Sequence, residues 1–393
     1  MKRSTSRILT SHAGSLARPL DLLEMIRARV NGETSDEAAF NARVASAVKT
    51  IVKEQADNAV DIVDDGELGK PMFADYVVDR LSGFEGVNPD PSVAFVRGDN
   101  LPEPFPAYAA WRAAQGAGAG FVGLREKRPR CIAPLAWKDR AYERDIANLK
   151  AALAEVDVEE GFLPSPSPGI IVMRIPNQYY KTEEEYLFAV ADAMHDEYKA
   201  ITDAGLILQI DAPDAAMSWD RQLWSGLSEF RSALGQRIEA LNHALQGIPE
   251  EQVRFHVCWG NGEAPHVNDI PLQDIVDLML QVKAQCYSVE AANPRHGHEW
   301  ALWQDVQLPE GKVLMPGVID SVTQFVEHPE LVAQRIVQYA NIVGRENVIA
   351  GTDCGFGTFA DNLHIDPRIA WAKLTALADG ARRASHELWG KAA

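Results

Sequence analysis

Short runs of apolar and β-branched residues recur along the whole chain, and most of them end in a polar or small residue. Continuously apolar runs of this length are typical of strands that are buried on both faces of a parallel sheet. Nine runs fit this description, at residues 8–15, 60–67, 131–137, 170–175, 206–211, 253–259, 285–290, 313–320 and 348–354.

Helical patterns separate most of the predicted strands. The clearest begins at Thr182, which forms a capping box with Glu185, and ends near Ala204, just before Gly205. Further helices are predicted over residues 36–59, 224–245, 272–284, 329–343 and 366–383. Because strands that alternate with helices form parallel βαβ units, and eight such units fit the chain, the pattern favours an α/β fold, a (β/α)8 TIM barrel.

A barrel of this type has eight strands, so one of the nine candidates is expected to be accessory, and residues 131–137 are our choice. Residues 83–130 are rich in Gly, Pro and Ala and are expected to leave the barrel after its second strand as a loop or small subdomain. Residues 164–168 are interpreted as a second, shorter linker. We therefore expect residues 1–393 to form a single barrel domain with one excursion.

The composition is that of a soluble, acidic globular protein, with 46% hydrophobic residues and a formal net charge of −18. This charge repels phosphate backbones, so nucleic acid is not expected as a partner. No apolar run approaches the roughly 18 residues that cross a bilayer, and no apolar signal-peptide segment follows the basic amino terminus. Four scattered cysteines indicate reduced thiols, so we expect a cytoplasmic protein without a membrane partner.

Reactive side chains in such a barrel lie at the carboxyl ends of the strands, where the loops form a mouth. His256 and Cys258 are one residue apart on a predicted strand, so their side chains point to the same face. Imidazole and thiolate are ligands that zinc prefers, although a buried core pair would have the same spacing. Glu290 and Cys354 end two other strands and complete a tetrahedral site of one His, two Cys and one Glu.

Other candidates lie around this mouth. His296 and His298 lie in a loop beyond a strand end and are candidates for proton transfer or substrate contact, or for no role at all. Asp353 lies at a strand end and is a third catalytic candidate, and Tyr179 is a candidate wall of a substrate pocket. No dinucleotide-binding, P-loop or nucleophile-elbow motif is present, so dehydrogenase, kinase and serine hydrolase functions have no support.

Several short segments resemble, in order, the catalytic half of cobalamin-independent methionine synthase, a zinc methyltransferase built on a (β/α)8 barrel. They are His12-Ala-Gly-Ser-Leu, Asp65-Gly-Glu67, Asp75-Tyr76, Leu81-Ser-Gly-Phe84, Gln209-Ile-Asp211-Ala-Pro213, Phe255-His-Val-Cys258, the strand that ends in Glu290, Pro316-Gly-Val-Ile-Asp320 and Gly351-Thr-Asp-Cys-Gly355. The resemblance covers essentially the whole chain, and the His-x-Cys, Glu and Asp-Cys-Gly set is its most specific part.

This resemblance implies a zinc-dependent S-methyltransferase of methionine biosynthesis that works without cobalamin. The Zn²⁺ ligands would be His256, Cys258, Glu290 and Cys354. The ion would activate a small-molecule thiol acceptor, homocysteine or a similar thiol, toward a methyl donor such as a methylated folate. Thiol alkylation of this kind requires neither nucleic acid nor a membrane, and it is compatible with an assembly of identical subunits.

The same resemblance assigns four residues to the substrate site, namely His12, Ser15, Glu67 and Asp211. Two of these carry carboxylates, which would neutralise the ammonium group of an amino-acid thiol. The chain departs from the family at Val322, which stands where the family has a catalytic histidine. His296 or His298 is the expected replacement.

Three alternatives stay open at this point. The same zinc–thiolate chemistry serves alkyltransferases and lyases of the epoxyalkane–coenzyme M type, whose acceptor is a different thiol. A metal-free barrel resembling uroporphyrinogen decarboxylase would need arginines at the mouth, where this sequence places acidic residues. A zinc-storage or structural protein would have a closed site with four protein ligands.

Overall fold

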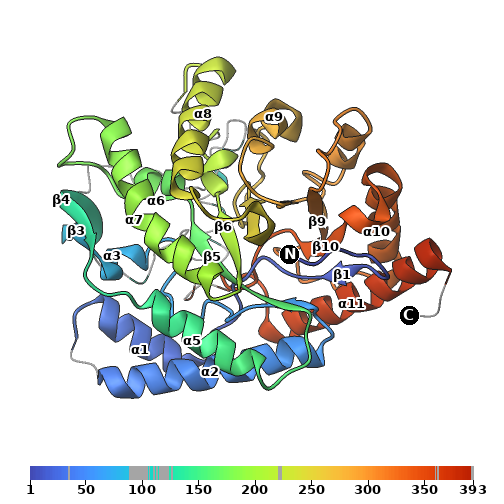
Figure 1. Cartoon of the computed structure of the whole chain (residues 1–393), viewed down its shortest axis with the longest axis horizontal. Helices are drawn as coiled ribbons and strands as arrows, with labels where there is room; N and C mark the ends of the chain where they lie inside the picture. Colours follow the sequence, from blue (N-terminus) through green and yellow to red (C-terminus); the bar gives the residue numbers. More distant parts are fainter. Residues whose placement is uncertain are drawn as a thin grey trace.

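The computed structural model of the chain describes residues 1–33, 36–87, 105, 107–108, 111, 114, 124, 127–219, 224–358, 360 and 363–390. Its main sheet has eight strands in the order β1-β10-β9-β8-β7-β6-β5-β2, and neighbouring strands are parallel. A parallel bridge between Ser11 and Ile62 joins the first and last strands of this order and closes the sheet. The chain is therefore a (β/α)8 TIM barrel, as the sequence predicts (Figure 1).

The barrel strands are β1 (Leu9–Thr10), β2 (Ile62–Val63), β5 (Glu160–Pro166), β6 (Ile207–Asp211), β7 (Val253–Val257), β8 (Cys286–Val289), β9 (Val313–Ile319) and β10 (Ile349–Thr352). Helices outside and side chains inside cover both faces of these strands, which explains their almost continuous apolar runs. One apolar cluster gathers residues from seven of the eight strands, namely Leu9, Ile62, Phe162, Ile207, Cys286, Val313, Met315 and Ile349. This apolar floor leaves the carboxyl end of the barrel for polar groups.

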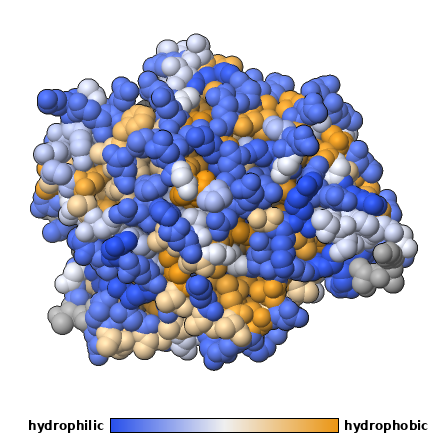
Figure 2. Space-filling view, in the orientation of Figure 1, coloured by the Kyte–Doolittle hydropathy of each residue, from blue (hydrophilic) through white to orange (hydrophobic). Residues whose placement is uncertain are grey.

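The outer helices are α1 (Leu20–Val30), α2 (Glu37–Asp57), α3 (Val77–Arg80), α5 (Tyr142–Leu153), α6 (Pro168–Arg174), α7 (Glu183–Asp203), α8 (Leu227–Ala244), α9 (Val276–Met279), α10 (Pro329–Val343) and α11 (Pro367–Trp389). The start of α7 agrees with the predicted cap, because Thr182 Oγ1 accepts a hydrogen bond from the Glu185 amide at 3.0 Å. None of the described helices combines the length and the apolarity that a membrane span requires. Hydrophilic residues cover much of the face that Figure 2 shows.

A small antiparallel sheet stands beside the barrel. It pairs β3 (Leu81–Val87) with β4 (Arg128–Trp137), so the predicted accessory strand at residues 131–137 is confirmed. The expected excursion over residues 83–130 lies largely outside the described residues, and its two described ends belong to these strands.

The predicted strand at residues 170–175 is wrong, because this segment belongs almost entirely to α6. Ser167 Oγ accepts a hydrogen bond from the Ile170 amide at 3.1 Å and caps the helix, and Pro168 occupies the first turn, a position that suits proline. The strand of this barrel unit is β5, which contains part of the predicted linker at 164–168. Periodicity alone does not separate a short buried helix from a buried strand, which explains the error.

The predicted helix at residues 272–284 forms only in part. The segment has one 3₁₀ turn, η4 (Leu272–Asp274), and the four-residue helix α9. The Leu272 amide donates to the Glu299 carboxylate at 2.6 Å. Short turns and one side chain, instead of a continuous helix, thus supply the hydrogen-bond partners of this backbone segment.

Candidate metal centre

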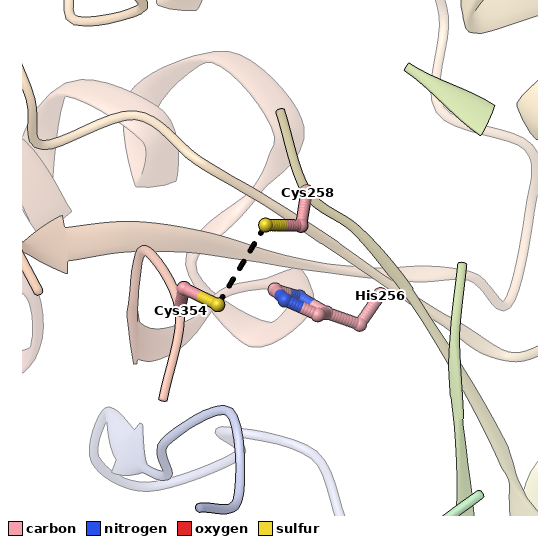
Figure 3. Close-up of side chains that lie close together, drawn as sticks. All are labelled: His256, Cys258 and Cys354. Carbon is pink, nitrogen blue, oxygen red and sulfur yellow. Dashed lines mark hydrogen bonds between the residues drawn. The ribbon is translucent and has the colours of Figure 1, made fainter. Parts of the chain in front are cut away.

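Three side chains from two distant parts of the chain meet at the carboxyl end of the barrel. They are His256 in β7, Cys258 just after β7, and Cys354 in the loop after β10. One nitrogen or sulfur atom from each lies within 4.8 Å of the other two, and the two sulfur atoms are 3.6 Å apart (Figure 3). All three residues are buried, with at most 8% of their surface exposed.

The backbone of the loop after β10 explains how Cys354 reaches this position. The loop lies directly on the loop after β1, because Gly355 has no side chain and a Cβ there would stand 2.0 Å from Ser15 Oγ. The amides of Phe356 and Gly357 donate to the Ser15 carbonyl at 2.9 and 3.0 Å. These contacts fix the Cys354 loop against the barrel and place its sulfur atom opposite the end of β7.

His256 uses one of its two ring nitrogens. Nδ1 lies 3.0 Å from Ser288 Oγ, whereas Nε2 is buried and has no hydrogen-bond partner among the described residues. Burial, assisted by the charge of Arg254, lowers the pKa of His256 to about 3, so the ring is neutral and Nε2 offers a lone pair when Nδ1 donates to Ser288. A buried nitrogen of this kind is costly to leave unpaired, and beside two sulfur atoms it suits zinc.

The two thiols are also suited to a metal ion. The contact with Cys354, together with burial, raises the pKa of Cys258 well above its usual range. A bound cation reverses this preference, because a coordinating thiol gives up its proton. The Gly260 amide already donates to Cys258 Sγ at 3.3 Å and would stabilise the thiolate. The donor set of this chain therefore fits a zinc ion.

Glu290 lies beside this cluster but outside it. Its Oε1 accepts a hydrogen bond from the Trp259 amide at 2.7 Å, and its Oε2 accepts from Asn293 Nδ2 at 2.9 Å and from Arg295 Nη2 at 2.8 Å. The structure thus brings together three of the four predicted ligands, and the role of Glu290 as the fourth stays a prediction.

Asp353 has both of its carboxylate oxygens in use. Oδ1 accepts from the amides of Ala291 and Ala292, and Oδ2 accepts from the amide and the side chain of Asn293, all at 2.8 Å. Gly317 makes room for this carboxylate, because a Cβ there would stand 2.0 Å from Oδ1. The geometry favours a role in holding the loop after β8 over the catalytic role that the sequence suggests.

The two histidines predicted to act in proton transfer lie in different surroundings. His296 is buried, with Nδ1 2.9 Å from the Glu299 carboxylate and Nε2 3.2 Å from the Asp269 carboxylate. Burial alone would lower its pKa, but hydrogen bonds to these two carboxylates raise the pKa of His296 to about 9. The ring is thus a cation with both nitrogens donating, whereas His298 is exposed.

Glu67 and Asp211 form a second acidic group at the mouth. Glu67 is buried and has a φ of +57°, and in the part of the chain that the structure describes its Oε2 has no hydrogen-bond partner. Asp211 Oδ1 accepts from Gln209 Nε2 at 2.7 Å. Burial raises the pKa of both carboxyls, and the charge of Glu67 raises that of Asp211 further. Burial disfavours the ionised form of both carboxyls, so a cation beside them, such as the ammonium group of an amino acid, would stabilise that form.

His12 and Tyr179, also predicted at the substrate site, show no such arrangement. The Gly14 amide donates to His12 Nδ1 at 3.2 Å, and Nε2 lies 2.7 Å from Gln55 Oε1, so both ring nitrogens are in use. Tyr179 is 49% exposed and packs edge-on against Tyr180. His12 therefore holds the loop after β1 in place, and Tyr179 lies at the surface.

Sequence reasoning missed two residues that support the cluster. Ser288 faces His256 because the two are register partners on β7 and β8, and register is not visible in the sequence. Asn261 joins two loops of the mouth, since Nδ2 donates to the Gly355 carbonyl at 2.7 Å and Oδ1 accepts from Ser321 Oγ at 2.9 Å. Asn261 lies three residues after Cys258 in the sequence, and this proximity is the feature that could have identified it.

Comparisons with known proteins agree with this architecture. The family model described as "Cobalamin-independent synthase, Catalytic domain" matches residues 130–366. A methionine synthase from Thermococcus kodakarensis is 25% identical over 383 residues (96% of this chain, 94% of the relative), and one from Saccharolobus islandicus is 26% identical over 385 residues (96% and 95%). The solved structure of a B12-independent methionine synthase from a Shewanella species, in complex with selenomethionine, has a TM-score of 0.73 at 20% identity and covers 98% of this chain and 100% of that one.

Proposed function

Since the chain belongs to the family of cobalamin-independent synthase catalytic domains, we propose that it transfers a methyl group to the sulfur atom of homocysteine or a similar amino-acid thiol. Relatives that match 96% of the chain are named methionine synthase, which supports methionine as the product. The observation that carries the proposal is the convergence of one imidazole nitrogen and two sulfur atoms, from His256, Cys258 and Cys354. The acidic mouth favours this chemistry over a decarboxylase that binds several carboxylates.

Zinc is the cofactor in this proposal. His256, Cys258 and Cys354 would hold it, and Glu290 is the candidate fourth ligand. A bound zinc ion supplies positive charge that lowers the pKa of the acceptor thiol. Ser288 orients the ring of His256 through Nδ1, so that Nε2 stays directed at the cluster.

The acceptor is held by its ammonium group in this proposal. Glu67 and Asp211 bind that group, because both carboxylates are buried and no described residue hydrogen-bonds Glu67 Oε2. Ser15, the third substrate candidate, lies against the loop that carries Cys354. The mouth then aligns the sulfur atom with the methyl group of the donor, a methylated folate or another molecule whose methyl is bonded to a leaving group.

We place this reaction in the cytoplasm. All four cysteines are free of disulfides in the structure, and a reducing compartment keeps thiols available for a metal ion.

The test compares zinc-loaded and metal-free protein with homocysteine and a set of methyl donors, with methionine measured by mass spectrometry. Zinc-dependent formation of methionine supports the proposal. Full activity in a metal-free preparation, or no transfer from any donor to any thiol, would refute it. A thiol screen on cobalt-substituted protein identifies the acceptor independently of the donor, since a thiol that reaches the metal changes the visible spectrum.

A further inference from the structure

Arg18 lies in the segment after β1 and bonds two other loops of the barrel mouth. Its Nε donates to the Lys70 carbonyl at 2.9 Å, and its Nη2 donates to the Glu67 carbonyl at 2.9 Å, both in the loop after β2. Its Nη1 donates to the Gly357 carbonyl at 2.8 Å, in the loop after β10. Arg18 is buried, with 5% of its surface exposed. One buried guanidinium group therefore joins the loop of Glu67 to the loop that carries Cys354.

The bonds of Arg18 fix the main chain of both loops. Glu67 has a φ of +57°, a conformation that costs free energy in a residue other than glycine and persists when the surrounding structure holds it. The Glu67 carbonyl also accepts from the Lys70 amide at 3.0 Å. A Cβ on Gly357 would stand 2.3 Å from the Leu16 carbonyl oxygen, so the loops after β1 and β10 touch backbone to backbone. A guanidinium group suits this position, because its donors point in fixed directions.

The charge of Arg18 also acts on the Glu67 carboxyl. Burial raises the pKa of this carboxyl, whereas the positive charges of Lys70 and Arg18 oppose the shift. Arg18 thus favours the ionised form of Glu67, which is the form that attracts an ammonium group. Its three bonds to carbonyl oxygens hold the guanidinium in place, so this charge stays at a fixed distance from the carboxylate.

In the proposed function the acceptor spans two points of the mouth. Glu67 and Asp211 hold its ammonium group, and its sulfur atom reaches the cluster that contains Cys354. The number of methylenes between amine and sulfur therefore has to match the spacing between the loops after β2 and β10. We propose that Arg18 is a positioning residue that sets this spacing and thereby selects the chain length of the amino-acid thiol. The inference rests on the proposed function and adds a determinant of specificity to it.

A chain-length series on the wild type gives the first test. The acceptors are cysteine, homocysteine and the amino-acid thiol with one methylene more, and their Kd values are measured from the visible spectrum of cobalt-substituted protein, without a methyl donor. A fixed spacing should give one preferred length, with the Kd of each neighbour higher by about 10- to 100-fold. Three values within about threefold of one another overturn the inference. A spectrum that no thiol changes refutes the proposed function instead.

Arg18→Lys keeps the positive charge and loses the fork of donors, so the loops are no longer held at one spacing. The Kd of homocysteine should rise about 10- to 100-fold, and its advantage over the two neighbours should shrink to within about threefold. The homocysteine analogue without the amino group should bind both proteins within about twofold, because it does not use Glu67. The matched control is Arg335→Lys, since Arg335 also donates to two carbonyls, those of Val318 and Ala292, at 2.9 and 3.0 Å. It should change the Kd of homocysteine and of the analogue by the same factor.

A double substitution separates positioning from a general structural role. Glu67→Gln removes the group through which Arg18 acts, so Arg18→Lys should raise the Kd of homocysteine by less than about twofold in that background. Two effects that multiply overturn the inference, and so does an Arg18→Lys protein that binds homocysteine and the amine-free analogue equally less well. If Arg18→Lys does not fold, Gly357→Ala takes its place, because its Cβ pushes the same loops apart, and it should give the same pattern.

Discussion

The sulfur atoms of Cys258 and Cys354 lie 3.6 Å apart, although 96 positions separate the two residues in the chain. Cys258 follows β7 and Cys354 follows β10, and two other strands lie between these in the sheet. The contact is possible because a closed barrel directs the carboxyl ends of all its strands toward one mouth. The thiol pair is thus a property of the whole fold, and changes to the pair should affect metal binding more than folding.

The first prediction concerns metal content. Cys354→Ser and His256→Ala should each lower the affinity for zinc by at least about a hundredfold, because each removes one of three converging donors. Elemental analysis after dialysis measures the loss. Cys286→Ala is the control, since it removes a thiol from the apolar floor of the barrel, and it should keep one zinc per chain. Equal zinc content in all variants would place the metal elsewhere.

The second prediction concerns the orientation of the His256 ring. Ser288→Ala removes the partner of Nδ1 and should weaken zinc binding about 10- to 100-fold, as is typical of groups that orient a ligand. Competition with a chromophoric chelator measures the change. Ser82→Ala is the control, because Ser82 Oγ bonds the Ala136 carbonyl in the small sheet. An unchanged zinc affinity in Ser288→Ala contradicts the role of this serine.

The third prediction concerns substrate binding. Glu67→Gln should raise the KM for homocysteine about 10- to 100-fold and leave kcat nearly unchanged, since a hydrogen bond to a charged group contributes about 1.5–3 kcal/mol. Initial-rate kinetics separate the two constants. Glu184→Gln, in the exposed first turn of α7, should behave as the wild type. A fall in kcat at constant KM would show that Glu67 does not hold the acceptor.

Local pattern was enough to predict much of this fold. α10 has the bounds that the sequence predicts, because its amphipathic period starts at a proline and stops at Gly344. The alternation along β7 explains why His256 and Cys258 share one face. These features depend on residues that are close in the chain, which is the information that a single sequence contains.

The features of the fold that the sequence does not predict depend on contacts between residues that are distant in the chain. Local propensity predicts a strand where the buried helix α6 forms. It also predicts a linker at the end of the strand β5, which contains two prolines. Helices α1 and α5 were not predicted, and the pairing of Ser288 with His256 depends on strand register. Likewise, nothing near Asp269 in the sequence shows that Arg295 and His296 both contact its carboxylate.

The fourth prediction concerns the pH dependence of folding. Burial, partly offset by the hydrogen bond to Gln55, lowers the pKa of His12 from 6.5 to about 4 in the folded chain. The unfolded chain therefore binds one more proton between these values, so the free energy of unfolding is highest above about pH 6.5 and falls as the pH drops toward 4. The shift corresponds to about 3 kcal/mol in total, of which about 2 kcal/mol is lost by pH 5.

Urea unfolding of His12→Asn near neutral pH and near pH 5 measures this contribution. The substitution should flatten the pH dependence by about 2 kcal/mol relative to the wild type, whatever it does to stability at neutral pH. His243→Asn, in an exposed ion pair, should keep the slope of the wild type. Equal slopes in all three proteins would mean that His12 is not buried in its neutral form.

The last prediction separates a positioning role of Asp353 from a catalytic one. Asp353→Asn replaces one acceptor oxygen by an NH₂ group that faces the amides now bonded to the carboxylate. Buried donors without acceptors cost about 1–3 kcal/mol each, so the free energy of unfolding should fall by about 2–5 kcal/mol. Gly317→Ala should act in the same direction, because its Cβ would stand 2.0 Å from Asp353 Oδ1.

The two roles differ in what each variant loses. If Asp353 holds the loop after β8, both variants should lose stability, and thermal unfolding and kcat should change together because the loop also carries the partners of Glu290. If Asp353 instead transferred a proton, Asp353→Asn would lose far more activity than its loss of stability explains, and Gly317→Ala would retain more activity at a comparable loss of stability. Asp379→Asn, on the surface of α11, is the control, because its only change is an exposed ion pair worth about 0–1 kcal/mol.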